Sequence, residues 1–324
     1  MRAVVAREAG GPEVLELVEV EDLTVGPGEL LLDVTAAGVN RADLLQRQGH
    51  YPPPPGASPL IGLEVSGHVA VVGAGVEGWS VGDACVALLA GGGYAEQVVV
   101  PAGQVVAPPP GMDLVEAAGL IEVAATVVSN LDLAHLSAGE VFLVHGGAGG
   151  IGSFAIQYAR SLGATVLATA GAAEKVAYCR SVGAHHAFSY RDDWAAQVRS
   201  LAPEGVDLVL DSVGARYLET HQQLMATEGR LVVIGMQGGA RATLDLAALL
   251  SRRGLVTATS LRPRPPAEKA EICRRVVERV WPLLVDGTIA PTPQTTFPLA
   301  EASAAHAHLE SGDHLGKLVL VVRR

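Results

Sequence analysis

A short apolar run that leads directly into a glycine-rich turn constrains the fold of this 324-residue chain more than any other feature. Residues 141–145 have the composition of a buried strand, the turn 146–152 follows, and a helix-compatible stretch begins at once. Gly147, Gly149 and Gly152 have the spacing G-x-G-x-x-G, which allows a tight turn, close approach of a pyrophosphate, and close packing of helix on strand. The pyrophosphate would rest on the N–H groups that open the helix. The pattern predicts a dinucleotide site rather than a structural glycine turn, with cofactor contacts at Gly147, Gly149, Gly150 and Ile151.

The next predicted strand, residues 164–171, indicates which dinucleotide binds. A site for NAD usually places an Asp or Glu about 20 residues after the glycine loop, where it holds the ribose 2′-hydroxyl. Ala170 stands where that acid would fall, and Lys175 follows on the next predicted helix. A missing carboxylate and an added cation both favour NADPH, because the ammonium can meet a 2′-phosphate. The alternative is that Lys175 is an ordinary solvated helix residue.

The chain is long enough for two domains, and its pattern changes along its length. Residues 1 to about 120 are rich in strands and turns, whereas residues 122–260 alternate between strands and helices, which is typical of a doubly wound parallel sheet. The tail holds a predicted helix (267–285), a short helix (299–309) and a closing strand (315–322). We therefore expect an α/β protein in which a β-rich domain (1–122, completed by 261–324) accompanies a Rossmann domain (123–260). The strands predicted in the second domain are 141–144, 165–169, 187–188, 206–210, 230–234 and 255–257.

Charge and composition exclude several classes of function. The formal net charge is −11, which disfavours nonspecific binding of nucleic acid. The longest apolar runs, such as 65–76, are broken by Gly, His or Ser, so no membrane span is predicted, and a cytoplasmic protein is expected. Cys85, Cys179 and Cys273 lie far apart, which predicts buried, inert thiols rather than a disulfide framework or a cysteine zinc site.

Several longer motifs, in order along the chain, carry a family resemblance. The chain resembles the medium-chain dehydrogenase/reductases over its whole length, and most closely the NADPH-dependent quinone oxidoreductases of the zeta-crystallin type, in their p53-inducible branch. The resemblance implies a GroES-like domain around a Rossmann domain, with the active site in the cleft between them. The matching stretches are 37–43 (AGVNRAD), 47–52 (RQGHYP), 62–67 (GLEVSG), 90–96 (AGGGYAE), 145–152 (HGGAGGIG) and 211–214 (DSVG).

The same resemblance predicts that the protein holds no metal. Asn40, Leu63 and Glu122 stand where zinc-dependent relatives place the ligands of their catalytic zinc, and this set cannot form the usual three-ligand site. Without a Lewis acid, the hydride acceptor must be electrophilic by itself. A quinone is the expected small-molecule substrate. An enone or enoyl-thioester reductase, and a mainly non-catalytic NADPH-binding protein, are the alternatives.

The resemblance also implies the residues of the site. Gly171, Lys175 and Tyr190 match the surroundings of the 2′-phosphate, although Ala172 stands where many relatives carry a Ser, which would soften the preference for NADPH. Asn40, Tyr51 and Thr126 match positions near the nicotinamide and its ribose. The remaining cofactor contacts implied are Ser212, Gly235, Met236, Leu261, Arg262 and Lys317.

Tyr51 is the expected catalytic residue, because its proline-stiffened loop would fix a phenol beside the reacting oxygen. Alternatives stay open for three of these residues: Asn40 as a turn cap, Tyr51 as an apolar anchor, and Lys317 as a solvated strand end. Glu64, in an apolar strand, needs a buried partner, which Arg47 or Arg41 could supply. The strand predicted at 255–257 should form a sheet edge, and relatives pair there, so a homodimer is expected.

Overall fold

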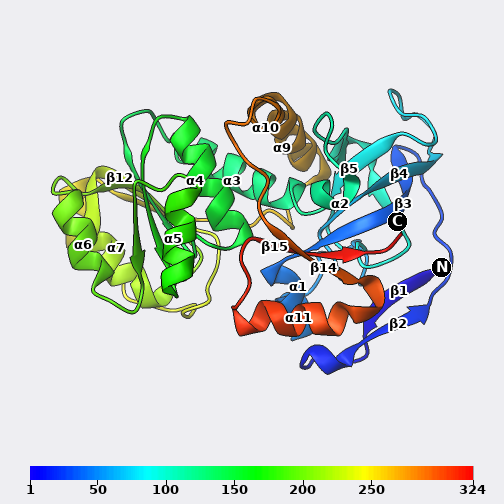
Figure 1. Cartoon of the computed structure of the whole chain (residues 1–324), viewed down its shortest axis with the longest axis horizontal. Helices are drawn as coiled ribbons and strands as arrows, with labels where there is room; N and C mark the ends of the chain where they lie inside the picture. The colour runs from blue at the N-terminus through cyan, green and yellow to red at the C-terminus, as the bar shows by residue number, and fades with distance from the viewer. Residues whose placement is uncertain (324) are drawn as a thin grey trace. The chain divides into compact units, whose positions relative to one another are not determined.

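The computed structural model describes residues 1–323, which divide into two compact units (Figure 1). Unit 1 comprises Met1–Ala125, Leu261–Val285 and Pro291–Arg324. Unit 2 comprises Thr126–Ser260 and Asp286–Ala290. Each unit has its own hydrophobic core, formed in unit 1 around buried residues such as Leu30 and Val65, and in unit 2 around residues such as Leu143 and Val209.

Unit 2 is built on a six-stranded sheet whose strands all run parallel. The strand order is β10-β9-β8-β11-β12-β13. Strands β9 and β10 are therefore added on one side of β8, and β11, β12 and β13 are added on its other side. This is the doubly wound order of dinucleotide-binding folds, and it confirms the predicted fold class. The strands are β8 (Val141–His145), β9 (Thr165–Ala170), β10 (His186–Ser189), β11 (Val206–Asp211), β12 (Met225–Val233) and β13 (Leu255–Ala258).

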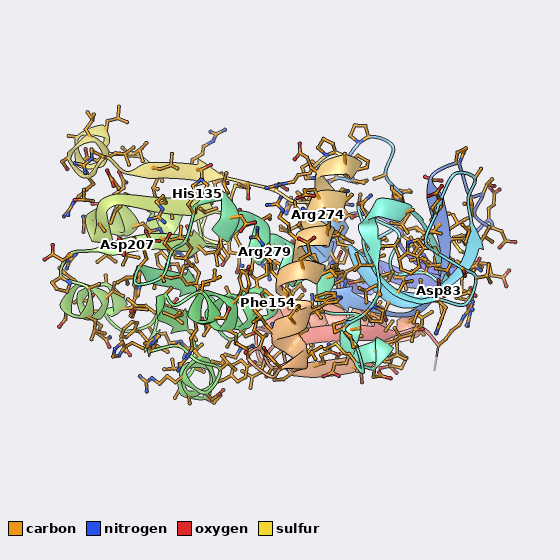
Figure 2. All side chains as sticks on the ribbon, turned by 90° about the horizontal axis from the view of Figure 1, so that it is seen from above. Asp83, His135, Phe154, Asp207, Arg274 and Arg279 are labelled. Carbon is orange, nitrogen blue, oxygen red and sulfur yellow. The ribbon has the colours of Figure 1, made fainter. Side chains whose placement is uncertain are left out.

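Helices connect these strands, as parallel pairing requires. Helices α4 and α5 both pack against β9, and Figure 1 shows them in green beside the sheet. Phe154 on α4 is buried in the core (Figure 2). The boundary between the two units falls inside α3. The elements are α3 (Ile121–Leu133), α4 (Gly150–Ser161), α5 (Ala173–Ser181), α6 (Trp194–Leu201), a 3₁₀ turn η3 (Ala215–Tyr217), α7 (Leu218–Leu224) and α8 (Leu246–Arg252).

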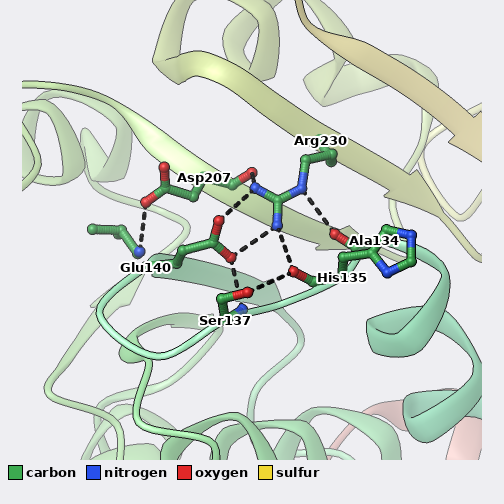
Figure 3. Close-up of polar contacts among 7 residues, drawn as sticks. Ala134, His135, Ser137, Glu140, Asp207 and Arg230 are labelled. Atoms are coloured by element: carbon green, nitrogen blue, oxygen red, sulfur yellow. Dashed lines mark hydrogen bonds and ion pairs between the residues drawn. The ribbon is translucent and has the colours of Figure 1, made fainter.

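Arg230 of β12 ties together the amino-terminal edge of the sheet in unit 2 (Figure 3). Its guanidinium donates to both carboxylate oxygens of Glu140, at 2.9 and 2.8 Å, and to the backbone oxygens of Ala134, His135 and Asp207. The Asp207 carboxylate in turn accepts the N–H of Val141 at 2.7 Å. A planar, multidentate cation of this kind fixes the ends of three strands, at the edge opposite the glycine loop.

Unit 1 is built on mostly antiparallel strands. Its seven-stranded sheet has the order β14-β15-β3-β4-β5-β7, with β6 also paired to β3, and β1 and β2 form a separate pair. The long central strand β3 has β15 on one side and β4 on the other. The strands are β1 (Arg2–Ala6), β2 (Leu15–Glu19), β3 (Glu29–Val39), β4 (Glu64–Val72), β5 (Ala84–Leu88), β6 (Gln97–Pro101), β7 (Val105–Val106), β14 (Gln294–Pro298) and β15 (Lys317–Val321).

The helices of unit 1 differ from the predicted ones in two places. The helix expected over 267–285 is two helices, because Pro282 has no N–H to continue the hydrogen-bond ladder. The helix expected over 299–309 begins as a 3₁₀ turn and continues to Ser311. Figure 2 labels Arg274 and Arg279 on α9. The helical elements are η1 (Pro12–Val14), α1 (Arg41–Arg47), η2 (Ala102–Gln104), α2 (Leu114–Ala117), α9 (Pro266–Arg279), α10 (Trp281–Val285), η4 (Leu299–Glu301) and α11 (Ala302–Ser311).

One stretch bears on the expectation that no segment spans a membrane. Leu114–Leu133 has the length and apolar character that a membrane span would need. Its most apolar window is 78% buried inside the protein, so its hydropathy is that of a core helix. The three cysteines are buried and free, as predicted, and burial raises the pKa of each thiol to about 12.

Candidate functional site

The carboxyl edge of the sheet in unit 2 gathers most of the predicted cofactor contacts. Because the strands are parallel, the residues that follow them meet at one edge, and ligands of such folds bind there, where the strand order reverses. The reversal lies between β8 and β11, and the glycine loop follows β8. The other predicted contacts at this edge are Gly171 after β9, Tyr190 after β10, Ser212 after β11, and Gly235 and Met236 after β12.

The glycine loop has a tight backbone that other residues could not adopt. Gly146 has a positive φ of 67°, so the turn lies one residue before the first glycine of the predicted pattern. A Cβ on Gly152 would collide with the carbonyl oxygen of Gly146, and a Cβ on Gly147 would lie 2.7 Å from the sulfur of Cys179. At Gly149 the nearest atom would be 3.5 Å away, which leaves the outer side of the loop open.

The loop also presents the start of α4 to a ligand. Gly149 is the N-cap of this helix, and no side chain caps it. The first amide groups of an uncapped helix need acceptors, and the helix dipole favours an anion there. Gly150 and Ile151 are the first two residues of α4, so the predicted pyrophosphate contacts fit this helix end.

The end of β9 fits a phosphate better than a ribose hydroxyl. Ala170 is the last residue of the strand and is buried, so no acid closes it. Gly171 and Tyr190 lie together, since a Cβ on Gly171 would be 2.6 Å from the Tyr190 hydroxyl oxygen. Lys175 lies in the first turn of α5, where Ala172 is an N-cap without a side-chain hydrogen bond.

Asp211 organises the loop that carries Ser212. Its carboxylate accepts the N–H groups of Val213 and Gly214 at 2.7 and 2.9 Å, and burial raises its pKa to about 6. The loop after β12 packs directly on this turn, because a Cβ on Gly235 would lie 2.8 Å from the carbonyl oxygen of Ser212. The two loops therefore form one surface beside the glycine loop.

Two buried histidines lie beneath this edge. The Nε2 atoms of His145 and His221 are 2.8 Å apart, and His145 Nδ1 lies 2.7 Å from the Thr169 hydroxyl. Burial lowers the pKa of His221 to about 3 and that of His145 well below its usual value. Asp211 lies 3.8 Å from His221 Nδ1. The three side chains are close enough to be considered as metal ligands. However, the 2.8 Å separation is a hydrogen bond, so the two facing nitrogens share a proton.

Unit 1 contains a second polar group, which joins three strands. Lys317 Nζ lies 2.6 Å from Asn40 Oδ1 and 2.6 Å from Glu64 Oε1, and Asn40 Nδ2 donates to the same carboxylate oxygen at 3.0 Å. We call these three residues the Lys317 triangle. All three are buried, so Lys317 is not a solvated strand end. Glu64 was expected to pair with Arg47 or Arg41, and that expectation was wrong.

A buried chain of hydrogen bonds leads away from the triangle. Asp43 Oδ2 accepts the Asn40 N–H at 2.7 Å and the Tyr94 hydroxyl at 3.2 Å. The Tyr94 oxygen lies 3.0 Å from His306 Nε2, and His306 Nδ1 lies 3.4 Å from the guanidinium of Arg47. Because Arg47 can only donate, His306 carries its proton on Nε2, and every donor in the chain points toward Asp43. Burial raises the pKa of Asp43 to about 7.

Arg262 holds the loop that carries Tyr51. Its guanidinium donates to the backbone oxygens of Ala90 and Tyr51 at 2.7 and 3.3 Å, and to the Gln46 side chain at 2.7 Å. Leu261, beside it, is partly buried. The structure thus brings Tyr51, Leu261 and Arg262 together in unit 1. Thr126, the remaining predicted contact, is buried in α3, where its carbonyl accepts the Asn130 amide.

Two of the three positions that hold zinc ligands in zinc-dependent relatives, Asn40 and Leu63, do not fit a zinc ion. The Asn40 oxygen already accepts a hydrogen bond from the Lys317 ammonium, as does the Glu64 carboxylate, and this ammonium would repel a second cation. Leu63 is buried and offers no ligand atom. The Asn40 and Glu64 oxygens therefore form a binding site for the Lys317 ammonium.

Sequence reasoning missed the residues that act through distant partners. Asp43, Tyr94, His306 and the His145–His221 pair were not predicted as site residues. Their partners lie 51 to 212 residues away along the chain. One signal was available for Asp43, which stands three residues after Asn40 at the position of an N-terminal capping box.

Comparison with known proteins identifies the class. Residues 26–110 match the family model of the alcohol dehydrogenase GroES-like domain, and residues 150–278 match that of the zinc-binding dehydrogenases. The structure aligns with that of an Escherichia coli quinone oxidoreductase complexed with NADPH, at a TM-score of 0.90 and 29% identity, over 99% of this chain and 100% of the other.

Proteins of similar sequence include reductases of several kinds. A quinone oxidoreductase of Pseudomonas aeruginosa is 33% identical over 96% of this chain and 97% of its own length. A 2-haloacrylate reductase of a Burkholderia species is 32% identical over 98% of both chains. A mycocerosic acid synthase-like polyketide synthase of Mycobacterium tuberculosis is 34% identical over 98% of this chain, which spans only 15% of that relative. The chain belongs to the medium-chain dehydrogenase/reductase family, and quinone oxidoreductases are among its relatives.

Proposed function

We propose that this protein uses NADPH to reduce quinones by hydride transfer. The observation that carries the proposal is the carboxyl edge of the sheet in unit 2. There an uncapped helix end follows the glycine loop, and Lys175 with Tyr190 takes the place of an acid at the end of β9. The helix end suits the pyrophosphate of NADPH and the lysine suits its 2′-phosphate, and the related Escherichia coli enzyme was solved with that cofactor.

When bound, NADPH supplies a hydride from its nicotinamide ring. The amide groups of Gly150 and Ile151 would hold the pyrophosphate, and Lys175 would pair with the 2′-phosphate. The loops that carry Ser212 and Gly235 would bind the rest of the cofactor, toward its nicotinamide end. The protein's own contribution is mainly to align the reactants and to stabilise the charge that develops on the acceptor oxygen.

The polar residues of unit 1 indicate the class of acceptor. An ammonium and an amide can donate hydrogen bonds to an oxygen, but they polarise a carbonyl less than a metal ion does. The acceptor must therefore be electrophilic already, as a quinone is. The quinone takes the hydride, its oxygen gains negative charge, and a proton from water completes the hydroquinone. Tyr51 is the residue we expect to donate a hydrogen bond to that oxygen.

Reduction of a conjugated alkene is the second candidate. The Burkholderia relative is named as a reductase of 2-haloacrylate, which has a double bond conjugated to a carboxylate. The polyketide synthase relative is far longer, and its match with this chain extends over about one seventh of it. Hydride addition to an enone or enoyl thioester would use the same residues. A mainly non-catalytic NADPH-binding role is the third candidate.

Steady-state assays would separate these candidates. NADPH oxidation is measured at 340 nm with a panel of quinones, enones and enoyl thioesters, and NADH serves as the comparison cofactor. Reduction of quinones with a higher kcat/KM than any alkene supports the proposal. A higher kcat/KM for an enone or a thioester would assign the protein to the second candidate. Tight NADPH binding without turnover of any acceptor would assign it to the third.

A further inference from the structure

The Lys317 triangle fixes the orientation of one amide. Asn40 follows β3, Glu64 begins β4 and Lys317 begins β15, and β3 pairs with both of the other strands. An ammonium has donors only, so the atom of Asn40 that faces Lys317 at 2.6 Å must be its oxygen. The amide nitrogen then faces the Glu64 carboxylate at 3.0 Å, as a donor. A flipped amide would set donor against donor and acceptor against acceptor.

In this orientation, one N–H group of the Asn40 amide is not used by the triangle. The Asn40 side-chain nitrogen carries two N–H groups, and only one of them is directed at Glu64. Within residues 1–323, the second N–H has no protein acceptor. The residue keeps 7% of its surface exposed, unlike Glu64, which is fully buried. An acceptor from outside the chain can therefore satisfy this N–H.

The chain is arranged to keep a buried ion pair at this point. A Cβ on Gly38 would collide with Glu64 Oε1, and one on Gly119 would lie 3.2 Å from Lys317 Cε, so both glycines make room for the pair. The second oxygen of Glu64 accepts the N–H of Glu122 at 3.0 Å. A buried ion pair stabilises a fold little compared with apolar residues of similar volume. Stability alone therefore does not explain why the pair is there.

We propose that Lys317 and Glu64 are positioning residues, which hold the Asn40 amide so that its second N–H donates to an oxygen of the bound reactants. The inference rests on the proposed function, since it deepens the role of the same site. Two oxygens have the required chemistry: a ribose hydroxyl of the cofactor, and the carbonyl oxygen of the acceptor. In both cases Lys317 acts through Asn40 and not by its own contact.

A double-mutant cycle tests this dependence. The variants are Asn40→Ala, Lys317→Met and the double variant, and kcat/KM is measured with a quinone. We expect about a tenfold or larger loss from each single change and no further loss in the double variant, because Lys317 has nothing left to orient. Losses that multiply would overturn the inference, and so would an Asn40→Ala variant that matches the wild type in both kcat/KM and NADPH binding.

Matched controls separate positioning from stability. Arg230→Met breaks a comparable ion pair, with Glu140, in unit 2 (Figure 3). It should lower Tm, leave kcat/KM unchanged below Tm, and show no coupling to Asn40→Ala. If Lys317→Met does not fold, Glu64→Gln replaces it in the cycle, because it keeps the shape of the side chain while removing the charge.

Measurements of NADPH binding show which of the two oxygens accepts the Asn40 N–H. The dissociation constant of NADPH is measured by fluorescence for the same variants. A coupled loss of NADPH binding assigns the oxygen to the ribose, whereas a loss of kcat/KM with unchanged NADPH binding assigns it to the acceptor. A wild-type protein that reduces no acceptor would defeat the proposed function, and the NADPH cycle would then decide the inference by itself.

Discussion

The guanidinium of Arg262 lies over the ring of Tyr51, 5.2 Å from the ring centroid. The same guanidinium also donates a hydrogen bond to the backbone oxygen of Tyr51. Burial lowers the pKa of Arg262, but an arginine remains charged throughout the physiological range. The cation therefore fixes both the ring and the backbone of this loop, and the phenol is held without help from a ligand.

The first prediction concerns that phenol. Tyr51→Phe keeps the ring under Arg262 and removes only the hydroxyl, so it should lower kcat modestly and leave KM nearly unchanged. The effect should stay below the 10²–10³ known for loss of an oxyanion donor, because a hydroquinone anion needs less stabilisation than an alkoxide. Tyr51→Ala should also raise the KM for the quinone, since it removes the ring. If Tyr51→Phe has the kcat and KM of the wild type with every quinone, Tyr51 contributes ring packing and no hydrogen bond to the reaction.

A second prediction concerns cofactor preference. Lys175→Ala should weaken NADPH binding at least tenfold and leave NADH binding nearly unchanged, because only NADPH carries a phosphate for the ammonium. A hydrogen bond to a charged group contributes about 1.5–3 kcal/mol. Titration of protein fluorescence with each cofactor measures both dissociation constants. Arg180→Ala, at an exposed position on the same helix, is the control. Equal losses for the two cofactors would place Lys175 away from the phosphate.

The third prediction is that the purified protein carries no stoichiometric zinc. The Asn40 and Glu64 oxygens are bound to the Lys317 ammonium, and Leu63 has no ligand atom. Activity should therefore survive dialysis against a chelator. Elemental analysis that finds one zinc per chain, lost together with activity, would show that the ammonium can be displaced by a metal.

A fourth prediction concerns assembly. Within residues 1–323, β13 is the last strand of its sheet and pairs only with β12, so its outer edge is open in this part of the chain. Leu255 on this strand is half exposed, and Leu246 and Leu250 on α8 are exposed as well. Open edges and apolar side chains of this kind favour pairing with a second copy. Light scattering should give a homodimer, and Leu255→Glu should give a monomer, whereas Leu201→Glu on α6 should not change the mass. A monomeric wild type would rule this out.

Local pattern was enough to predict the sheet of unit 2 and its ligand edge. The strand before Gly146 and the helix after Gly149 have periodicities that do not depend on distant residues, and their parallel order follows from the alternation of strand and helix. The absence of an acid at Ala170 could also be read directly from the sequence.

The polar groups of unit 1 could not be predicted in this way. Glu64 was expected to pair with a nearby arginine, but its partner Lys317 lies 253 residues away. That pairing exists because β15 returns to β3, and no local pattern reports which strands become neighbours. Arg47 is instead bonded to Gly10, His306 and Glu310. Sequence therefore indicated that Glu64 needs a partner but could not identify it.

The last prediction concerns Asp43, whose raised pKa affects stability. The carboxyl is fully buried, with Glu64 nearby, while Lys317, Tyr94 and the N–H of Asn40 favour its charged form. Its pKa is about 7 in the folded protein, against 3.8 for an aspartate exposed to water, so between these values the folded state binds a proton that the unfolded state has lost. This group must therefore make the protein less stable as pH rises from about 4 to about 7, by up to roughly 1.4 kcal/mol per pH unit, with no further change above that range.

Other buried groups act in the opposite direction. His221 and His306 have pKa values of about 3 when folded, so they lower stability as pH falls below about 6.5. The wild-type curve alone would therefore not isolate Asp43. The informative quantity is the difference in unfolding free energy between the wild type and Asp43→Asn, measured by urea denaturation at several pH values from 4 to 8. Relative to Asp43→Asn, the wild type should lose unfolding free energy as pH rises from 4 to 7. Above pH 7 the difference should stay constant.

Tyr94→Phe provides the companion measurement. It removes a hydroxyl that donates to Asp43 and so favours the carboxylate, which means that the pKa of Asp43 should rise further and the pH window should extend upward. If the unfolding free energies of the wild type and of Asp43→Asn change in parallel from pH 4 to 8, Asp43 is ionised over the whole range. The buried carboxylate would then be stabilised mainly by the donors that converge on it, from Asn40 and Tyr94.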